Sequence, residues 1–224
     1  MEYNGKYAEG SIHNSVNYGK FVVIKYTSSR KITLEFLDTG YTVTVRGDAI
    51  KSGKIKDKLR PSIHGFGFVG VGKQPTSVAG KTTSAYGRWE RMLARCYQET
   101  HKHYEYYGGR GVTVCEEWRN FQNFSDWYLR ECSKLNISPD NKEYEIDKDI
   151  SCANIYSPET CQLITVQSNS EVSKAKHYKF INPEGEVVEV YNLRKFCRDN
   201  DLAQSHMWAV HNHDAVSHKL WTKA

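Results

Sequence analysis

The most chemically distinctive residues of this sequence are the lysines at positions Lys51, Lys54, Lys56 and Lys58. Residues 1–80 hold 12 Lys and Arg against 6 Asp and Glu, so the net charge of +5 for the 224-residue chain originates in this part. A local basic cluster indicates a partner with a phosphate backbone. We therefore predict phosphate contacts from Lys54, Lys56 and Lys58, with solvated loop lysines as the alternative interpretation.

A second group of side chains has the types that bind zinc. His101 and His103 lie near Cys96 and Cys115 in the sequence, and histidine and cysteine are the usual zinc ligands. The six cysteines of the chain contain no CxxC pair, however, which disfavours a structural zinc site or a disulfide framework. We predict buried cysteine thiols in a reducing compartment and histidines in exposed loops.

The C-terminal segment combines a predicted hairpin over residues 178–190 with a helix–turn–helix. The first helix is capped by Asn192, and the second spans residues 203–210. The start of a recognition helix contacts base edges, and three residues here can form hydrogen bonds: Gln204, Ser205 and His206. The first helix carries three cations that would face the DNA backbone: Arg194, Lys195 and Arg198. A plain surface helix is the alternative interpretation.

Other segments predict the elements that position these residues. Residues 20–46 alternate with the strand period between turn signals, which predicts a three-stranded meander. The glycine-rich residues 65–72 would close it into a small SH3-like β-barrel. Residues 73–85 are polar and aperiodic, which is typical of a linker. A helix capped by Ser84 follows, and residues 118–129 form a second, aromatic-faced helix.

Further along, the predicted order is strand, strand, helix. The strands are residues 144–150 and 161–165, and the helix is residues 166–176. The fold class is therefore α+β. We predict three domains: a basic β-barrel at 1–75, a core at 84–175 and a helix–turn–helix module at 177–224.

Residues 84–175 also contain an ordered series of motifs. They are Trp89-x-x-Met92-Leu93-x-Arg95-Cys96, Tyr107-Gly108-Gly109-Arg110-Gly111-Val112-x-Val114-Cys115-x-x-Trp118-x-x-Phe121-x-x-Phe124, Ile146-Asp147-Lys148-Asp149, Tyr156-Ser157-Pro158-Glu159-Thr160-Cys161 and Ser168-Asn169. In order and approximate spacing, this series resembles the phage-type HNH (ββα-metal) endonucleases. The tail, with Asn182-Pro183-x-Gly185-Glu186, Asn192-Leu193-x-x-Phe196-Cys197 and His218-Lys219-x-Trp221, is similar to the nuclease-associated modular DNA-binding repeat of homing endonucleases.

The resemblance implies a ββα-metal core that hydrolyses a DNA phosphodiester with the help of a metal ion. Asp147 matches the strand aspartate that binds the metal, and Asn169 matches the helix residue, His or Asn, that completes the site. Carboxylate and amide oxygens suit Mg²⁺ or Mn²⁺. Asp149 is a candidate second ligand, with a solvated or ion-paired carboxylate as the alternative.

The sequence departs from the family pattern at two positions. Lys148 stands where most members have the general-base histidine, directly after the aspartate. A lysine is ordinarily protonated at neutral pH, so it would stabilise charge on the phosphate, or act as a base only if burial lowered its pKa. Thr160 stands at the position of the asparagine that orients the base. His101 and His103 are alternative sources of the base, and Arg110, in a glycine-rich turn, is a predicted phosphate contact.

These observations predict a homing-type endonuclease, monomeric, that nicks or cuts double-stranded DNA in the cytoplasm, the host cytoplasm if a phage encodes it. One alternative is a catalytically degenerate HNH-fold protein that only binds DNA. Another is an interaction protein whose β module binds a host protein. No apolar run approaches the ~18–20 residues of a membrane span, and Met1–Gly5 does not begin a secretory signal, so we set membrane and secreted proteins aside.

Overall fold

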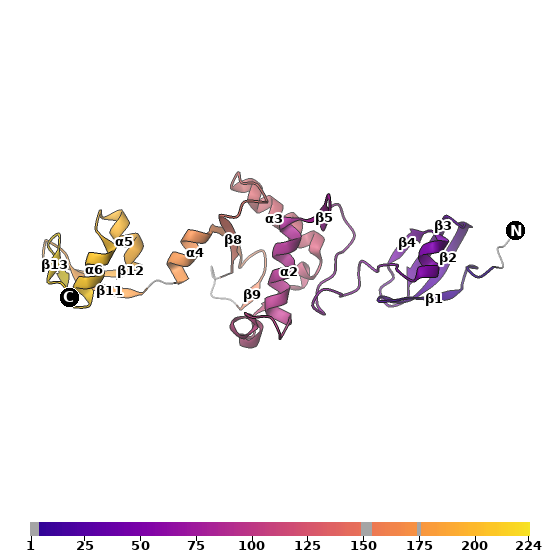
Figure 1. Cartoon of the computed structure of the whole chain (residues 1–224), viewed down its shortest axis with the longest axis horizontal. Coiled ribbons are helices and arrows are strands. Elements are labelled where there is room, and N and C mark those ends of the chain that lie inside the picture. The colour runs from indigo at the N-terminus through magenta and orange to yellow at the C-terminus, as the bar shows by residue number, and fades with distance from the viewer. Residues whose placement is uncertain (1–4, 149–153, 174–175) are drawn as a thin grey trace. The chain divides into compact units, whose positions relative to one another are not determined.

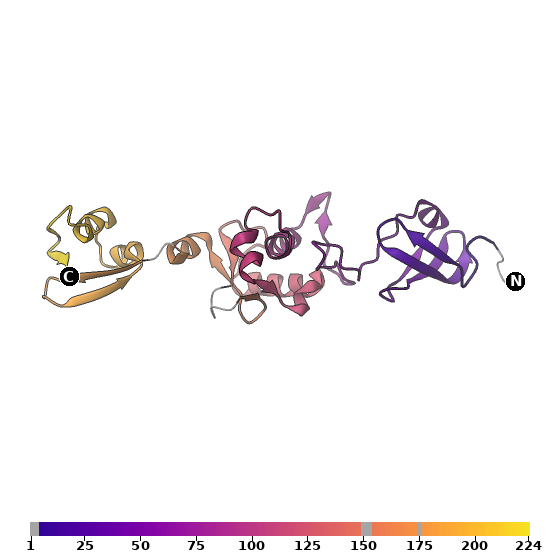
Figure 2. The ribbon, with the colours of Figure 1, turned by 90° about the horizontal axis from the view of Figure 1, so that it is seen from below.

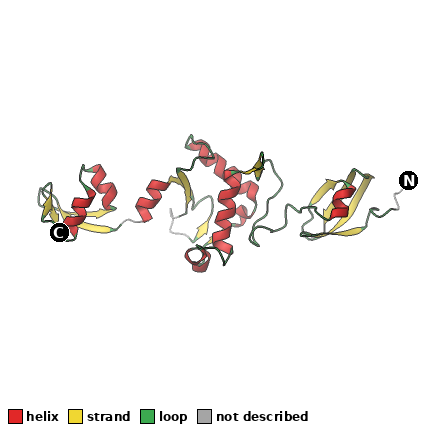
Figure 3. Ribbon diagram, viewed as in Figure 1, coloured by secondary structure: helices red, strands yellow, loops and turns green. Residues whose placement is uncertain are grey.

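The computed structural model describes residues 5–148, 154–173 and 176–224 (Figure 1). The chain is a mixed α+β protein, as predicted, and each of its parts contains both helices and strands (Figure 3). It divides into two compact units. The first is Met1–Asp140 with Lys148–Cys161, and the second is Asn141–Asp147 with Gln162–Ala224.

The N-terminal part of the first unit is a four-stranded antiparallel sheet (Figure 2). The strands are β1 (Ile12–Ser15), β2 (Gly19–Ser28), β3 (Lys31–Phe36) and β4 (Thr42–Val45), paired in that order and followed by α1 (Gly47–Ser52). Alternate apolar residues of β2 and β3 are buried, and they pack with Ile50 and Ile55. The predicted meander is confirmed and gains β1 as a fourth strand. Among the described residues the sheet is open, with β1 and β4 at its edges, rather than closed into a barrel.

The glycine-rich segment 65–72 does not extend this sheet, contrary to the prediction. It forms isolated bridges instead, from Ile63 to Gly67 and from Phe68 to Asn120, which lies immediately before a helix. A Cβ on Gly67 would lie only 2.7 Å from the buried Trp89 side chain. The glycine is therefore needed for close packing against the helical core, not for a bend in a barrel.

The predicted linker at 73–85 contains a small hairpin, β5 (Ser77–Val78) and β6 (Lys81–Thr82). The helix α2 (Ser84–Tyr97) follows, and its N-cap is Thr83 rather than Ser84, because the Thr83 hydroxyl accepts from the Tyr86 N–H (3.4 Å). The hairpin was not predicted, because strands of two residues are too short to show the alternation of apolar and polar residues.

The helical core is built around the aromatic residues of α2 and α3 (Phe121–Lys134). Trp89 and Trp118 are fully buried, and the Trp89 Nε1–H donates to the Trp118 carbonyl (2.7 Å). The predicted helix at 118–129 is interrupted at Asn120, which ends the 3₁₀ helix η3 (Glu116–Arg119) and caps α3. The remaining elements here are η1 (Tyr104–Tyr106), η2 (Gly108–Arg110) and the parallel pair β7 (Thr113–Val114) and β9 (Ile155–Tyr156).

The second unit begins with the predicted strand, strand, helix order. The strands β8 (Tyr144–Asp147) and β10 (Gln162–Thr165) are antiparallel, with Asp147 opposite Gln162, and α4 (Val166–Ser173) follows directly. The Thr165 hydroxyl accepts from the Ser168 N–H (3.1 Å) and so begins α4.

The C-terminal part of the second unit contains the predicted hairpin and two helices. The hairpin is β11 (His177–Ile181) and β12 (Val187–Tyr191), and the helices are α5 (Leu193–Asp199), capped by Asn192 as predicted, and α6 (Gln204–His211). Two strands not predicted, β13 (Ser217–His218) and β14 (Trp221–Lys223), complete a sheet of order β12-β11-β14-β13. These elements share a buried core of Phe180, Val190, Leu193, Cys197, Met207 and Val210.

Candidate functional site

The two predicted metal ligands both lie in the β8, β10, α4 motif. Asp147 is the last residue of β8, and Asn169 lies on α4. The Asn169 Nδ2–H donates to Glu145 Oε1 over 2.6 Å. Side chains two residues apart on a strand point to the same face, so Glu145 and Asp147 share the face of β8 that Asn169 approaches.

Glu145 is a site residue that the sequence interpretation missed. It lies two positions before Asp147, and this spacing on a predicted strand is the signal that would have identified it. Its carboxylate is half-buried, and its hydrogen bond fixes the amide nitrogen of Asn169. The bond uses that nitrogen, so the amide oxygen of Asn169 is the atom left to accept a metal ion.

The donor set of this motif fits a hard divalent cation. The Asp147 carboxylate and the Asn169 amide oxygen are ligand types that Mg²⁺ and Mn²⁺ take, and Mg²⁺ needs few of them because it retains waters. Within the described ranges, no three or more His, Cys, Asp and Glu side chains gather into a metal-binding group. The candidate ligand Asp149 lies outside the described residues.

The two predicted catalytic residues, Lys148 and Thr160, belong to the first unit. Lys148 directly follows β8 and is partly buried. Burial raises the pKa of the Cys96 thiol to about 11, against the opposing effects of the Arg95 and Lys148 charges. The Lys148 ammonium therefore lies close enough to α2 to act on this thiol, which stays neutral.

Thr160 is buried in the turn after β9. Its hydroxyl donates to the Ile155 carbonyl (2.6 Å) and accepts from the Ser157 N–H (3.0 Å). These hydrogen bonds give Thr160 a local role in holding the turn. Its predicted catalytic role stays a prediction.

The predicted zinc residues do not share an arrangement typical of a zinc site. The rings of His101 and His103 lie 5.7 Å apart in an exposed turn, whereas Cys96 is buried with a raised pKa. The five described cysteines are thiols, and all but Cys115 are buried, as expected for small apolar residues. Arg110, the predicted phosphate contact, is exposed on η2 with its guanidinium 5.5 Å from the Tyr106 ring centroid.

The three predicted lysine contacts lie in an irregular segment after α1. Gly53, Ile55 and Asp57 are buried, and the intervening Lys54, Lys56 and Lys58 are exposed. The Ser15 hydroxyl holds the segment by donating to the Ile55 carbonyl (2.7 Å), and Asp57 accepts from the Thr39 hydroxyl (2.7 Å). Because the alternate residues of this segment are buried and hydrogen-bonded, the three lysine side chains are directed into solvent.

The predicted DNA-reading residues are all exposed on α5 and α6. The cations lie on α5, and Arg198 Nε is also 3.8 Å from Asp199 Oδ1. The residues predicted to contact bases begin α6, with Met207 and Val210 buried beneath them. Trp208, which the sequence also places near the start of this helix, is half-exposed and adds an aromatic surface beside them.

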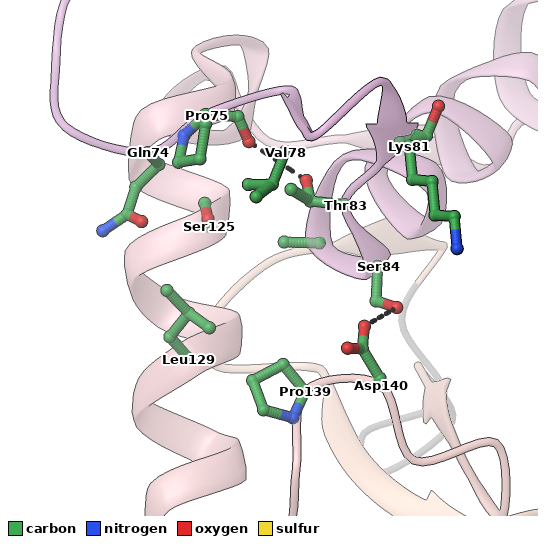
Figure 4. Close-up of a pocket in the computed structure, with 12 residues that line it drawn as sticks. Gln74, Pro75, Val78, Lys81, Thr83, Ser84, Ser125, Leu129, Pro139 and Asp140 are labelled. Atoms are coloured by element: carbon green, nitrogen blue, oxygen red, sulfur yellow. Dashed lines mark hydrogen bonds between the residues drawn. The ribbon is translucent and has the colours of Figure 1, made fainter.

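A hollow of about 450 Å³ lies between the start of α2, the β5–β6 hairpin and α3 (Figure 4). At its rim the Ser84 hydroxyl donates to Asp140 Oδ1 (2.6 Å), and the Thr83 hydroxyl donates to the Pro75 carbonyl (3.0 Å). None of the predicted site residues lines it. Because these polar groups are already paired with one another, the hollow indicates no particular ligand.

Comparison with known proteins finds no family model, no curated protein and no solved structure that matches this chain. Of the helices in the described residues, none has the length and apolar character that crossing a bilayer requires.

Proposed function

We propose that this protein is a metal-dependent DNA endonuclease of the homing type, with an HNH-like (ββα-metal) site on β8, β10 and α4. The observation that carries the proposal is the hydrogen bond from Asn169 on α4 to Glu145 on β8. It sets an amide beside the strand face that bears Asp147, in the element order that the resemblance implies.

In this proposal Asp147 and Asn169 hold Mg²⁺ or Mn²⁺, which supplies positive charge at the phosphodiester when bound. Glu145 keeps the Asn169 amide oriented. Hydrolysis forms one bond from a water oxygen to phosphorus and breaks one bond from phosphorus to a deoxyribose oxygen; the attacking water gives up one proton to solvent, and the departing deoxyribose oxygen takes up one. Lys148, directly after Asp147, stabilises the negative charge that develops on the phosphate.

The flanking parts supply affinity for double-stranded DNA. The N-terminal sheet, which we interpret as SH3-like, offers its row of lysines to phosphates, and this contact carries no sequence information. The α5–α6 pair offers cations to the backbone and polar side chains to base edges. We propose that the protein acts as a monomer.

A second candidate function is DNA binding without cleavage. Two observations favour it: a lysine replaces the usual general-base histidine, and the Thr160 hydroxyl is engaged within its own turn. The two candidates share every DNA contact and differ only in the chemistry at Asp147.

Cleavage of supercoiled and linear DNA tests both candidates. Purified protein is incubated with Mg²⁺, with Mn²⁺ or with EDTA, beside an Asp147→Asn variant and an exposed control of equal charge change, Glu184→Gln. Metal-dependent products that persist in the control and vanish in Asp147→Asn support the endonuclease. Intact DNA with binding retained favours the binding-only protein, and no binding at low salt rejects both.

A further inference from the structure

Arg95 on α2 lies against a pair of stacked tyrosine rings, which we call the aromatic clamp. Its guanidinium carbon is 4.9 Å from the Tyr107 ring centroid and 5.1 Å from that of Tyr156. The two rings are stacked, 6.4 Å apart and inclined by 22°. Both tyrosines are held in place, because Tyr156 is buried on β9 and the Tyr107 carbonyl accepts from the Val112 N–H (3.0 Å). The guanidinium therefore lies beside the stacked pair, within cation–π distance of both rings.

The clamp leaves the hydrogen-bond donors of Arg95 unused. Its Nε is buried and has no partner, and within residues 5–148, 154–173 and 176–224 its guanidinium makes neither a hydrogen bond nor an ion pair. Arginine stays charged under all ordinary conditions, and a buried donor without a partner costs free energy. A cation–π contact offsets part of the loss of hydration but satisfies no N–H group. A charged guanidinium whose Nε is buried without a partner is the arrangement expected of a site for an anion.

Among the residues that the structure describes, the groups around Arg95 do not supply that anion. Burial raises the pKa of the Tyr156 hydroxyl and of the Cys96 thiol, so both stay neutral. Glu90, on the same helix, is hydrogen-bonded with His64 (2.7 Å). Lys148 adds a second positive charge, which acts on the same Cys96 thiol as Arg95 does.

The positive charge of Arg95 also acts on His101, which lies shortly before η1. Burial lowers the pKa of His101, and the charges of His103, Arg95 and Lys102 lower it further. Glu90 opposes this effect, so the positive charges of Arg95 and Lys102 and the negative charge of Glu90 all act on His101.

We propose that Arg95 is a DNA phosphate-binding residue, held ready by Tyr107 and Tyr156 to form two parallel hydrogen bonds to one phosphate. The inference rests on the proposed DNA-binding function. A guanidinium can offer two parallel N–H groups to one phosphate, and its contacts with both rings reduce the side-chain entropy that remains to be lost on binding.

Two substitutions test this role while keeping the packing of the stem. Arg95→Met removes the charge and the fork, and Arg95→Lys keeps the charge without the fork. Arg88→Met is the matched control, because Arg88 is on the same helix with its guanidinium 5.5 Å from the Tyr128 ring centroid. Binding of a labelled DNA duplex is measured by fluorescence anisotropy over a range of salt concentrations, and thermal melting gives the folded fraction of each variant.

We expect Arg95→Met to bind about 10-fold or more weakly, as for a lost charged hydrogen bond, with a salt slope smaller by about 1. Arg95→Lys should keep the slope and lose affinity, and it replaces Arg95→Met as the deciding variant if the latter is not folded. Wild-type affinity and slope in a folded Arg95 variant, or an equal loss in Arg88→Met, would overturn the inference. Failure of the wild-type protein to bind the duplex would instead reject the proposed function itself.

Discussion

Replacement of Lys54, Lys56 and Lys58 by glutamine is expected to flatten the salt dependence of DNA binding. Each lysine that neutralises a phosphate contributes about 0.9 to the slope of log K against log salt concentration, so three contacts contribute about 2.7. Over a fourfold rise in salt this part of the slope amounts to about a 40-fold loss of affinity. The triple variant should therefore bind weakly at low salt and lose much less affinity as salt is added.

The structure explains why this substitution should leave the module folded. The three lysine side chains are exposed, whereas Gly53 and Ile55 are buried at alternate positions, and their carbonyls accept from the Ser15 hydroxyl. Glutamine keeps a comparable side-chain length and removes only the charge. Thermal melting of the variant should overlay that of the wild type.

The matched control removes three other exposed lysines of the same module, Lys20, Lys25 and Lys31. Both triple variants lose the same net charge, so a general electrostatic effect would change both slopes equally. Anisotropy titrations of a labelled duplex at several salt concentrations give the slopes. An unchanged slope in the Lys54, Lys56, Lys58 variant, or equal changes in both variants, would refute the assignment of these residues to the phosphate backbone.

Three further predictions concern the core, the site and the C-terminal part. Gly67→Ala would place a Cβ in steric overlap with the buried Leu93 side chain and should lower the free energy of unfolding by about 1–3 kcal/mol in urea titrations. Gly87→Ala, on α2, meets only the flexible end of the Arg91 side chain and should not lower it. Glu145→Gln should weaken the apparent Mg²⁺ affinity in cleavage assays by about 10–100-fold, because the hydrogen bond to Asn169 loses its charge; an unchanged Mg²⁺ dependence would exclude this positioning role. His218 accepts a hydrogen bond from the backbone N–H before α6 (3.2 Å), and its pKa is lowered by burial and by nearby cations. The unfolded chain therefore binds more protons, so the melting temperature should fall as pH drops below about 6.5, and less so in His218→Gln.

Much of the fold could be predicted where hydrophobic period and turn residues agreed. The alternation over β2 to β4 matched the buried face of the sheet, and the apolar residues of the two C-terminal helices matched their buried faces. The segment at 65–72 was misassigned because its glycines serve a long-range contact with α2, which local sequence does not encode. A break such as Asn120 is equally hard to place, because the aromatic residues on both sides are buried.

The residues of the candidate site could be predicted where their role depends on neighbours in the sequence, and not where it depends on distant residues. Asp147 and Asn169 came from a resemblance in motif order, and Glu145 was within reach of the strand period. Arg95 was not, because its significance depends on Tyr156, which lies far away in the sequence and joins it only through the parallel pairing of β7 and β9. A helical arginine between apolar residues gives no sequence signal of an aromatic clamp.

The residues proposed to bind DNA and the residues proposed to hold the metal lie on different elements, so DNA affinity and cleavage can be changed independently. The lysines after α1 are anchored to the core of the N-terminal sheet, and the polar residues of α6 lie over a core of their own. Glu145, Asp147 and Asn169 depend instead on the pairing of β8 with β10 and on the start of α4. Substitutions in groups that share no partners are expected to act additively. Removing lysines should therefore weaken binding without changing the cleavage rate of bound DNA, and removing Asp147 should do the reverse. A variant of Asp147 that lost binding and cleavage together would contradict this separation and place the DNA contact at the carboxylates themselves.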